Sequence, residues 1–583
     1  MVERHAANAR ALRSKKGCPE CRARKIKCDE KVPRCTPCVK TQRVCHLQDS
    51  VFKQHKSTGD SPLSSGESPA SQVSTHQAQH TSPTRWQSSA HQYPKLHAVP
   101  LPTSQNNPRL APVELTGKDL RCTQEELFLL RHYCSYLARW MDHLYRFEVF
   151  SRSVLVLARE HNMLRFAACS VAAKQLSQVN GELPKAAYSD TQERIAASIK
   201  SGPYGFAWYS AKYYELAIQT LTRSISRSDD HIVNLSDGEL MIHADQEDPI
   251  VRLLGTCMLI QYEHLDANRH AWSGHLTGFS KLLELIDGGR ILQSHPDFEQ
   301  VYPWTRDIMS VKACFWNFIV NDLEETFISR RRPRIDTKNL ALWRNMGLFV
   351  EDDGAISLLS ARQALITSAE HAQEKVLTYT LIWYLYKLID LIAVPETATS
   401  AMTPPTTNAH DSEFTWLEQR FDEWFTLLTP AFHPDGKFKA AASDDSTSKQ
   451  RVYEMWYCQD LSATTMLYYN MARILLLIHQ PPNRLLQSSS DLLNAFREVE
   501  NKLYEHGSDI LAIARGTLCD DVKLRAIQPL YVAGRCLNDD CDRGAVIDLL
   551  ASIQARLGVA TKYRADDLAR EWGTSSQNGT PQS

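Results

Sequence analysis

The chain has 583 residues, of which 43% are apolar and 23% charged, a composition typical of a globular protein. Its net charge of −1 conceals an asymmetry, since residues 1–50 carry a formal charge of +8 and the remainder a formal charge of −9. A basic head on a mildly acidic body indicates a nucleic-acid partner. No apolar run at the N-terminus resembles a signal peptide. The longest apolar stretch, 376–394, contains Lys387 and Asp390, so it predicts a buried core helix and no membrane partner.

A basic arm, 1–17, precedes a cluster of cysteines. Six of the 15 cysteines follow the spacing C-x2-C-x6-C-x6-C-x2-C-x6-C, in which the second half repeats the first. A structural zinc ion takes four ligands in a tetrahedron, so six thiolates serve two zinc ions only if two sulfurs bridge both metals. The segment 18–46 therefore predicts a module with two zinc ions as its cofactor. The predicted metal ligands are Cys18, Cys21, Cys28, Cys35, Cys38 and Cys45.

A chance cluster, a redox pair and a zinc-storage protein are the alternatives to a structural zinc module. A redox CxxC belongs to a βαβ context, and no strand pattern precedes Cys18. The long downstream body argues against storage. Because the chain lacks a secretion signal, we expect a reducing compartment and no disulfide framework. The other nine cysteines, such as Cys134, Cys257 and Cys458, are predicted to be small core side chains.

The segment Gly17–Asp29 (GCPECRARKIKCD), followed by Val32–Cys35 (VPRC), resembles the fungal binuclear zinc cluster family of transcription factors. In that family two zinc ions share six cysteines, and the first and fourth cysteines bridge both metals. The resemblance implies these ligand sets: bridging Cys18 and Cys35, with Cys21 and Cys28 on one zinc ion and Cys38 and Cys45 on the other.

The loop between the second and third cysteines, RARKIK, has four cations in six positions. Two Zn²⁺ ions with six thiolates carry a net charge of −2, so the head stays cationic and suits a polyanion. Alone, the loop also fits a nuclear localisation signal. Because zinc ligands frame the loop, we favour a DNA contact, and one loop can serve both purposes. The residues predicted to contact DNA are Arg22, Arg24, Lys25, Lys27, Lys40 and Arg43.

By resemblance, a short helix in the first half faces the DNA major groove and reads a CGG-type triplet. Lys25 matches the family's base-contacting lysine. The other five cations fit contacts to the phosphate backbone, which position a protein without specifying a sequence.

Residues 47–112 are predicted to be a disordered linker. In 53–112, Ser, Thr, Pro, Gln and His make up 36 of 60 residues, which is too polar a composition to order itself. Many relatives follow the cluster with a coiled coil, but no sustained heptad follows Cys45 here. The sequence is therefore compatible with DNA binding as a monomer. It is equally compatible with a homodimer or heterodimer formed through the body.

Helical periodicity dominates 113–572. Thr123–Glu126 predicts a capping box, and apolar residues at steps of three and four form stripes. The Gly288-Gly289 and Pro481-Pro482 pairs predict helix ends. No alternating pattern indicates a strand, and the tail 573–583 is predicted to be disordered. Stripes begin at Leu127, Val251, Trp272, Leu417 and Leu492.

The predicted fold class is mostly α: a small N-terminal zinc module, a disordered linker and a large all-helical domain. The helical body resembles the family's fungal-specific transcription factor domain, which implies regulation and binding of transcriptional co-regulators. A basic run, Arg330–Arg334, fits a solvated loop or a second nuclear signal.

None of the nucleotide-binding, serine-hydrolase or metalloprotease motifs occurs, so we expect no enzyme. The predicted function is a sequence-specific, double-stranded-DNA-binding regulator of RNA polymerase II transcription in the nucleus. The resemblance implies regulation of a metabolic pathway. The alternative is a zinc-cluster adaptor that binds protein or RNA.

Overall fold

The computed structural model describes residues 21, 28–29, 35–41, 122–145, 147–179, 188–232, 248–287, 306–357, 372–393, 407–439, 453–481, 492–517 and 519–573. The chain divides into two compact units, 1–104 and 105–583. The predicted arm (1–17), the predicted linker (47–112) and the predicted tail beyond Gly573 lie outside the described residues. In the first unit the described helix is α2, Thr36–Lys40.

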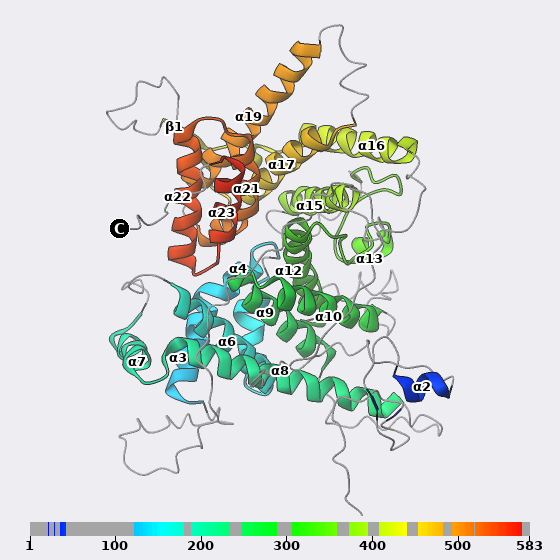
Figure 1. The fold of residues 1–583 in the computed structure, drawn as a ribbon. Helices are drawn as coiled ribbons and strands as arrows, with labels where there is room; N and C mark the ends of the chain where they lie inside the picture. The colour runs from blue at the N-terminus through cyan, green and yellow to red at the C-terminus, as the bar shows by residue number, and fades with distance from the viewer. Residues whose placement is uncertain are drawn as a thin grey trace, which may run out of the picture. The chain divides into compact units, whose positions relative to one another are not determined.

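The second unit, called the body here, is built from helices, as predicted (Figure 1). Its first half contains α3 (Gln124–His132), η1 (Tyr133–Leu137), α4 (Ala138–Asp142), η2 (Val149–Ser153), α5 (Val154–Leu157), α6 (Asn162–Gln178), α7 (Asp190–Ser201), α8 (Gly205–Ile232), α9 (Pro249–Asp266), α10 (Arg269–Asp287) and α12 (Arg306–Ser329). Its second half contains α13 (Leu340–Asn345), α15 (Ala372–Ile392), α16 (Thr407–Thr426), η4 (Pro430–Phe432), α17 (Asp460–His479), α19 (Leu492–Gly516), α20 (Asp520–Arg525), α21 (Ile527–Cys536), α22 (Asp540–Leu557) and α23 (Lys562–Glu571).

Local signals set several helix ends where the sequence predicts them. The Thr123 hydroxyl accepts a hydrogen bond from the backbone N–H of Glu126, whose carboxylate accepts one from the backbone N–H of Thr123, both at 3.2 Å. This is the predicted capping box at the start of α3. Helix α10 ends at Asp287, directly before Gly288, and α17 ends at His479, two residues before Pro481.

One hydrophobic core runs through the body. The described residues of the stripes from Val251 and Trp272 are buried, as predicted. In the stripe from Leu417, Leu417, Phe421 and Trp424 are fully buried and Leu428 is half-buried. The apolar stretch around Lys387 forms the buried helix α15. Among the described helices, α17 is long and apolar enough to cross a membrane, but 83% of its apolar window is buried inside the body.

Three local predictions are wrong. A two-stranded antiparallel sheet pairs β1 (Gly436–Lys439) with β2 (Tyr453–Trp456), although no strand was predicted. The stripe from Leu492 is not all core, because the Phe496 side chain on α19 is 52% exposed. Arg334 is not solvated: it forms ion pairs with the buried carboxylates of Asp322 and Glu325.

A buried carboxylate joins four helices of the body. Glu324 on α12 lies 3.0 Å from Arg525 Nη1 of α20 and 3.2 Å from His264 Nε2 of α9. The Tyr468 hydroxyl of α17 donates to it at 3.3 Å. Burial raises the pKa of Glu324, but Arg525 and His264 outweigh burial and hold the pKa below its usual value. The carboxylate is therefore charged and compensated inside the core.

We expect Arg525→Ala to lower the free energy of unfolding of the body by about 3–5 kcal/mol, because the substitution leaves the Glu324 charge buried without its partner. Urea unfolding followed by circular dichroism measures this. Arg535→Ala is the matched control, since Arg535 pairs with Glu571 at 2.9 Å on the surface and its loss should cost about 0–1 kcal/mol. Equal losses in the two variants would contradict this account.

We expect Gly516→Ala to destabilise the body by about 1–3 kcal/mol. A Cβ atom at Gly516 would lie 2.0 Å from the carbonyl oxygen of Met455 on β2, and backbone cannot move aside cheaply. Gly544→Ala on α22 is the control, because its Cβ would meet no atom within 4 Å and alanine favours the helix. Thermal unfolding of both variants tests the contrast, and an unchanged melting temperature in Gly516→Ala would contradict it.

Candidate metal centre and nucleic-acid interface

Helix α2 organises the second half of the cysteine module. Its N-cap is Cys35, whose carbonyl oxygen accepts hydrogen bonds from the backbone N–H groups of Cys38 and Val39, both at 3.1 Å. Pro37 lies in the first turn, where a missing N–H costs no helical hydrogen bond. The Asp29 carboxylate accepts a bond from the backbone N–H of Thr36 at 2.9 Å, which ties the chain after Cys28 to the start of α2.

The described cysteines of this unit form a buried cluster. Cys21, Cys28, Cys35 and Cys38 pack together, and each is at most 6% exposed. The Cys21 sulfur lies 3.5 Å from that of Cys35 and 3.8 Å from that of Cys38. These distances exclude disulfides, which require about 2.05 Å. A zinc tetrahedron with Zn–S bonds of about 2.3 Å has edges of about 3.8 Å, so the sulfur separations fit thiolates around zinc.

Cys35 is central in this cluster. Its sulfur belongs to one close group of ligand atoms with Cys21 and Cys38 and to another with Cys28 and the Asp29 carboxylate. A sulfur shared by two groups is what a bridging ligand requires. Cys21 and Cys38, which the resemblance assigns to different zinc ions, also lie in one group, so the sulfur positions alone do not divide the ligands between the metals.

Of the predicted DNA contacts, the structure describes Lys40. Its side chain is exposed, and it lies in the last turn of α2, two residues after the buried Cys38. The other predicted contacts and two of the predicted zinc ligands lie outside the described residues: Arg22, Arg24, Lys25, Lys27 and Arg43, together with Cys18 and Cys45.

The nine remaining cysteines are not uniformly core. Cys122, Cys169, Cys257 and Cys314 are buried, as predicted. Cys134, Cys519 and Cys536 are half-buried, and Cys458 and Cys541 are exposed, so the prediction is wrong for Cys458 and Cys541.

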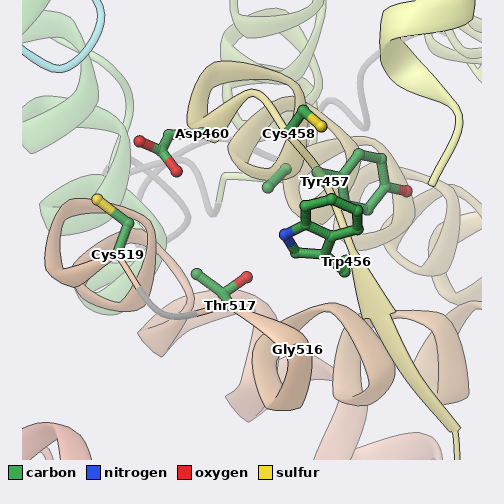
Figure 2. Close-up of a pocket in the computed structure, with 8 residues that line it drawn as sticks. Trp456, Tyr457, Cys458, Asp460, Gly516, Thr517 and Cys519 are labelled. Atoms are coloured by element: carbon green, nitrogen blue, oxygen red, sulfur yellow. The ribbon is translucent and has the colours of Figure 1, made fainter. Parts of the chain in front are cut away.

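Sequence reasoning missed a pocket in the body, called the Asp460 pocket here, where the end of β2, the start of α17 and the segment from α19 to α20 meet (Figure 2). The Asp460 carboxylate and the thiols of Cys458 and Cys519 line the pocket, and Cys458 and Cys519 are 61 positions apart in the chain. No local motif therefore signals the site. The pocket residues that concern its chemistry are Trp456, Cys458, Asp460, Thr517 and Cys519.

The described geometry thus defines a thiolate metal centre joined to an α-helical body. The chain matches the fungal Zn(2)-Cys(6) binuclear cluster domain over residues 16–54 and the fungal-specific transcription factor domain over residues 128–572, and it belongs to the family of fungal transcription factors built from these domains. It is therefore a DNA-binding transcription factor rather than an enzyme, and its six-cysteine cluster holds two zinc ions.

Two curated relatives carry the same kind of name. The chain is 25% identical over 517 residues to the transcription activator AMTR1 of Alternaria alternata, covering 81% of this chain and 67% of the relative. It is 34% identical over 101 residues to the transcription factor lfc1 of Flammulina velutipes, covering 16% of this chain and 35% of that relative. No solved structure matches the chain.

We expect Cys35→Ser to remove both zinc ions, because a bridging sulfur contributes to both metal sites and metal binding supplies the folding energy of such a module. Zinc per chain, measured by mass spectrometry on desalted full-length protein, should fall by about two. Cys541→Ser, at an exposed cysteine of α22, is the control and should keep the wild-type content. Loss of a single zinc ion in Cys35→Ser would contradict the bridging role.

Proposed function

We propose that this protein regulates RNA polymerase II transcription from the nucleus by reading CGG-type triplets in double-stranded DNA. The observation that carries the proposal is the convergence of the Cys21, Cys28, Cys35 and Cys38 thiols, which makes the basic loop between Cys21 and Cys28 part of a metal-framed module. The loop has four cations in six residues, and a rigid frame favours their use as DNA contacts.

The proposed roles divide the ligands and the cations. Cys18 and Cys35 bridge the two zinc ions, Cys21 and Cys28 complete one site, and Cys38 and Cys45 complete the other. Lys25 contacts the bases. The remaining predicted cations contact phosphates: Arg22, Arg24, Lys27, Lys40 and Arg43. The exposed Lys40 at the end of α2 supports this role, because its side chain is open to solvent beside a buried zinc ligand.

The proposed organisation assigns DNA reading to residues 18–46 and regulation to the body. An arm (1–17), a linker (47–112) and a tail (573–583) flank them, and the regulatory domain spans 113–572. The body would recruit co-regulators and carry the contacts of a homodimer or heterodimer. The name of the relative from Alternaria alternata favours activation as the output, and regulation of a metabolic pathway is the role that the family resemblance suggests.

Selection from randomised duplexes by the zinc-loaded full chain tests the proposal. We expect CGG-type triplets to be enriched and the enrichment to disappear on chelation, because metal binding supplies the folding energy of such a module. A second triplet at fixed spacing indicates a dimer, and a lone triplet indicates a monomer. No enrichment with both zinc ions bound would overturn DNA reading and favour an adaptor for protein or RNA.

Two loop variants separate base contacts from phosphate contacts. Lys25→Ala should weaken binding to the selected site by about 1–3 kcal/mol and relax the sequence preference. Lys27→Ala should weaken all duplexes about equally and lower the slope of log affinity against log salt by about one. Fluorescence anisotropy at several salt concentrations measures both quantities. Identical behaviour of the two variants would contradict the assigned roles.

A further inference from the structure

Three metal-ligating side chains of the body converge beside the Asp460 pocket. They are Asp460, Cys519 and Asp521, called the Asp–Cys–Asp triad here. One ligand atom from each lies within 4.8 Å of the others, the same closeness that the described cysteines of the zinc cluster reach. Among the residues that the structure describes, ligand atoms gather in this way only in these two places. The donors are one thiol and two carboxylates, all of which bind zinc.

Separate elements bring the triad together. Asp460 is the first residue of α17, whereas Cys519 is the N-cap of α20 and Asp521 lies in the first turn of α20. The Cys519 thiol donates a hydrogen bond to Asp521 Oδ1. All three side chains are half-buried, so they are accessible yet partly shielded from water.

A histidine contacts the Asp521 carboxylate at the oxygen that does not accept the hydrogen bond from Cys519. His143 Nδ1, just after α4, lies 2.6 Å from Asp521 Oδ2, and His143 Nε2 lies 2.8 Å from the Thr464 hydroxyl. The His143 side chain is only 2% exposed. A carboxylate held by a second group is typical of metal centres, in which outer partners fix the ligands. The contact leaves Oδ1, the oxygen on the Cys519 side, to face the triad.

The pocket gives a cation access to the triad. It has a volume of about 440 Å³ and is lined by Asp460 and Cys519 but by no lysine or arginine. Figure 2 shows these two residues on the same side of the pocket, across from the indole ring of Trp456. The space accommodates a metal ion together with a bound water, which completes four-coordination when the protein supplies three ligands.

Charges of both signs act on the triad, since Lys523 interacts with Cys519 and Arg525 interacts with Asp521 in addition to the acidic groups. Burial, followed by the hydrogen bond and charge of Asp521 and the charge of Asp460, raises the pKa of the Cys519 thiol. Burial raises the pKa of Asp521, but His143 outweighs burial, and the pKa lies well below its usual range, so this carboxylate is ionised. A divalent ion next to two carboxylates would reverse the effect on the thiol and stabilise the thiolate.

We propose that the Asp–Cys–Asp triad is a third metal site of this protein and that it binds a divalent cation of borderline softness, zinc in the first instance. On binding, the S–H bond of Cys519 breaks, the sulfur coordinates the metal and the proton passes to solvent. The ion links the start of α17 to the start of α20 and, through His143, to the end of α4. This inference concerns the body and does not rest on DNA reading by the N-terminal module.

Equilibrium dialysis of the full chain against buffered free zinc tests the site. We expect wild type to hold about three zinc ions per chain and Cys519→Ser about two, because serine is a poor zinc ligand. Serine is also a good N-cap, so α20 should remain intact, which far-ultraviolet circular dichroism checks. Asp460→Asn is a second variant that should lose the same ion. The matched controls are Cys541→Ser and Asp548→Asn, both exposed on α22, which should bind as wild type does.

A cobalt titration gives an independent readout. In a Cys35→Ser background, Co²⁺ should still produce a thiolate charge-transfer band, and adding Cys519→Ser should weaken that band, whereas adding Cys541→Ser should not. Equal zinc content in wild type and Cys519→Ser, or equal loss in Cys519→Ser and Cys541→Ser, would overturn the third site. Either result would leave the N-terminal cluster unaffected, because its zinc is measured separately through Cys35→Ser.

Discussion

The body depends on the compensation of one buried charge. Arg525 and His264 keep Glu324 ionised in the core and the Tyr468 hydroxyl donates a further hydrogen bond to it; these groups belong to α20, α9 and α17. Removing water from a carboxylate costs several kcal/mol. The helices that carry the partners of Glu324 must therefore pack together, because the partners offset this cost only when they surround the carboxylate. This requirement also places the start of α20 against α17 and α4, and hence Asp521 against His143.

The zinc module has a different constraint, which is its small size. A module of about thirty residues is too small to bury a core of its own. In the described part, the buried side chains are four cysteines whose sulfurs are spaced for zinc, so metal–thiolate bonds replace apolar burial as the source of stability. Residues that do not bind metal can therefore be charged, as the exposed Lys40, two positions after the buried Cys38, shows.

The sequence predicted the features that are encoded locally. Cysteine spacing identified the zinc cluster and the family, the capping box gave the start of α3, and 3–4 periodicity gave the helical body. Features that depend on residues far apart in the chain were not predictable. Arg334 in a basic run looks solvated until α12 supplies Asp322 and Glu325. The exposed Phe496 fits a core stripe, but periodicity does not report whether a neighbour covers it. The Asp–Cys–Asp triad arises only when α17 and α20 meet.

The separation of Glu324 from Arg525 has a consequence for synthesis of the chain. The two residues are 201 positions apart, and translation at about 5–20 residues per second separates their appearance by about 10–40 s. During that interval α9 and α12 have emerged while the guanidinium that neutralises their shared carboxylate has not. The nascent body therefore remains incompletely packed until nearly the last helices leave the ribosome, and a chain that stops before α20 retains an uncompensated charge in its core.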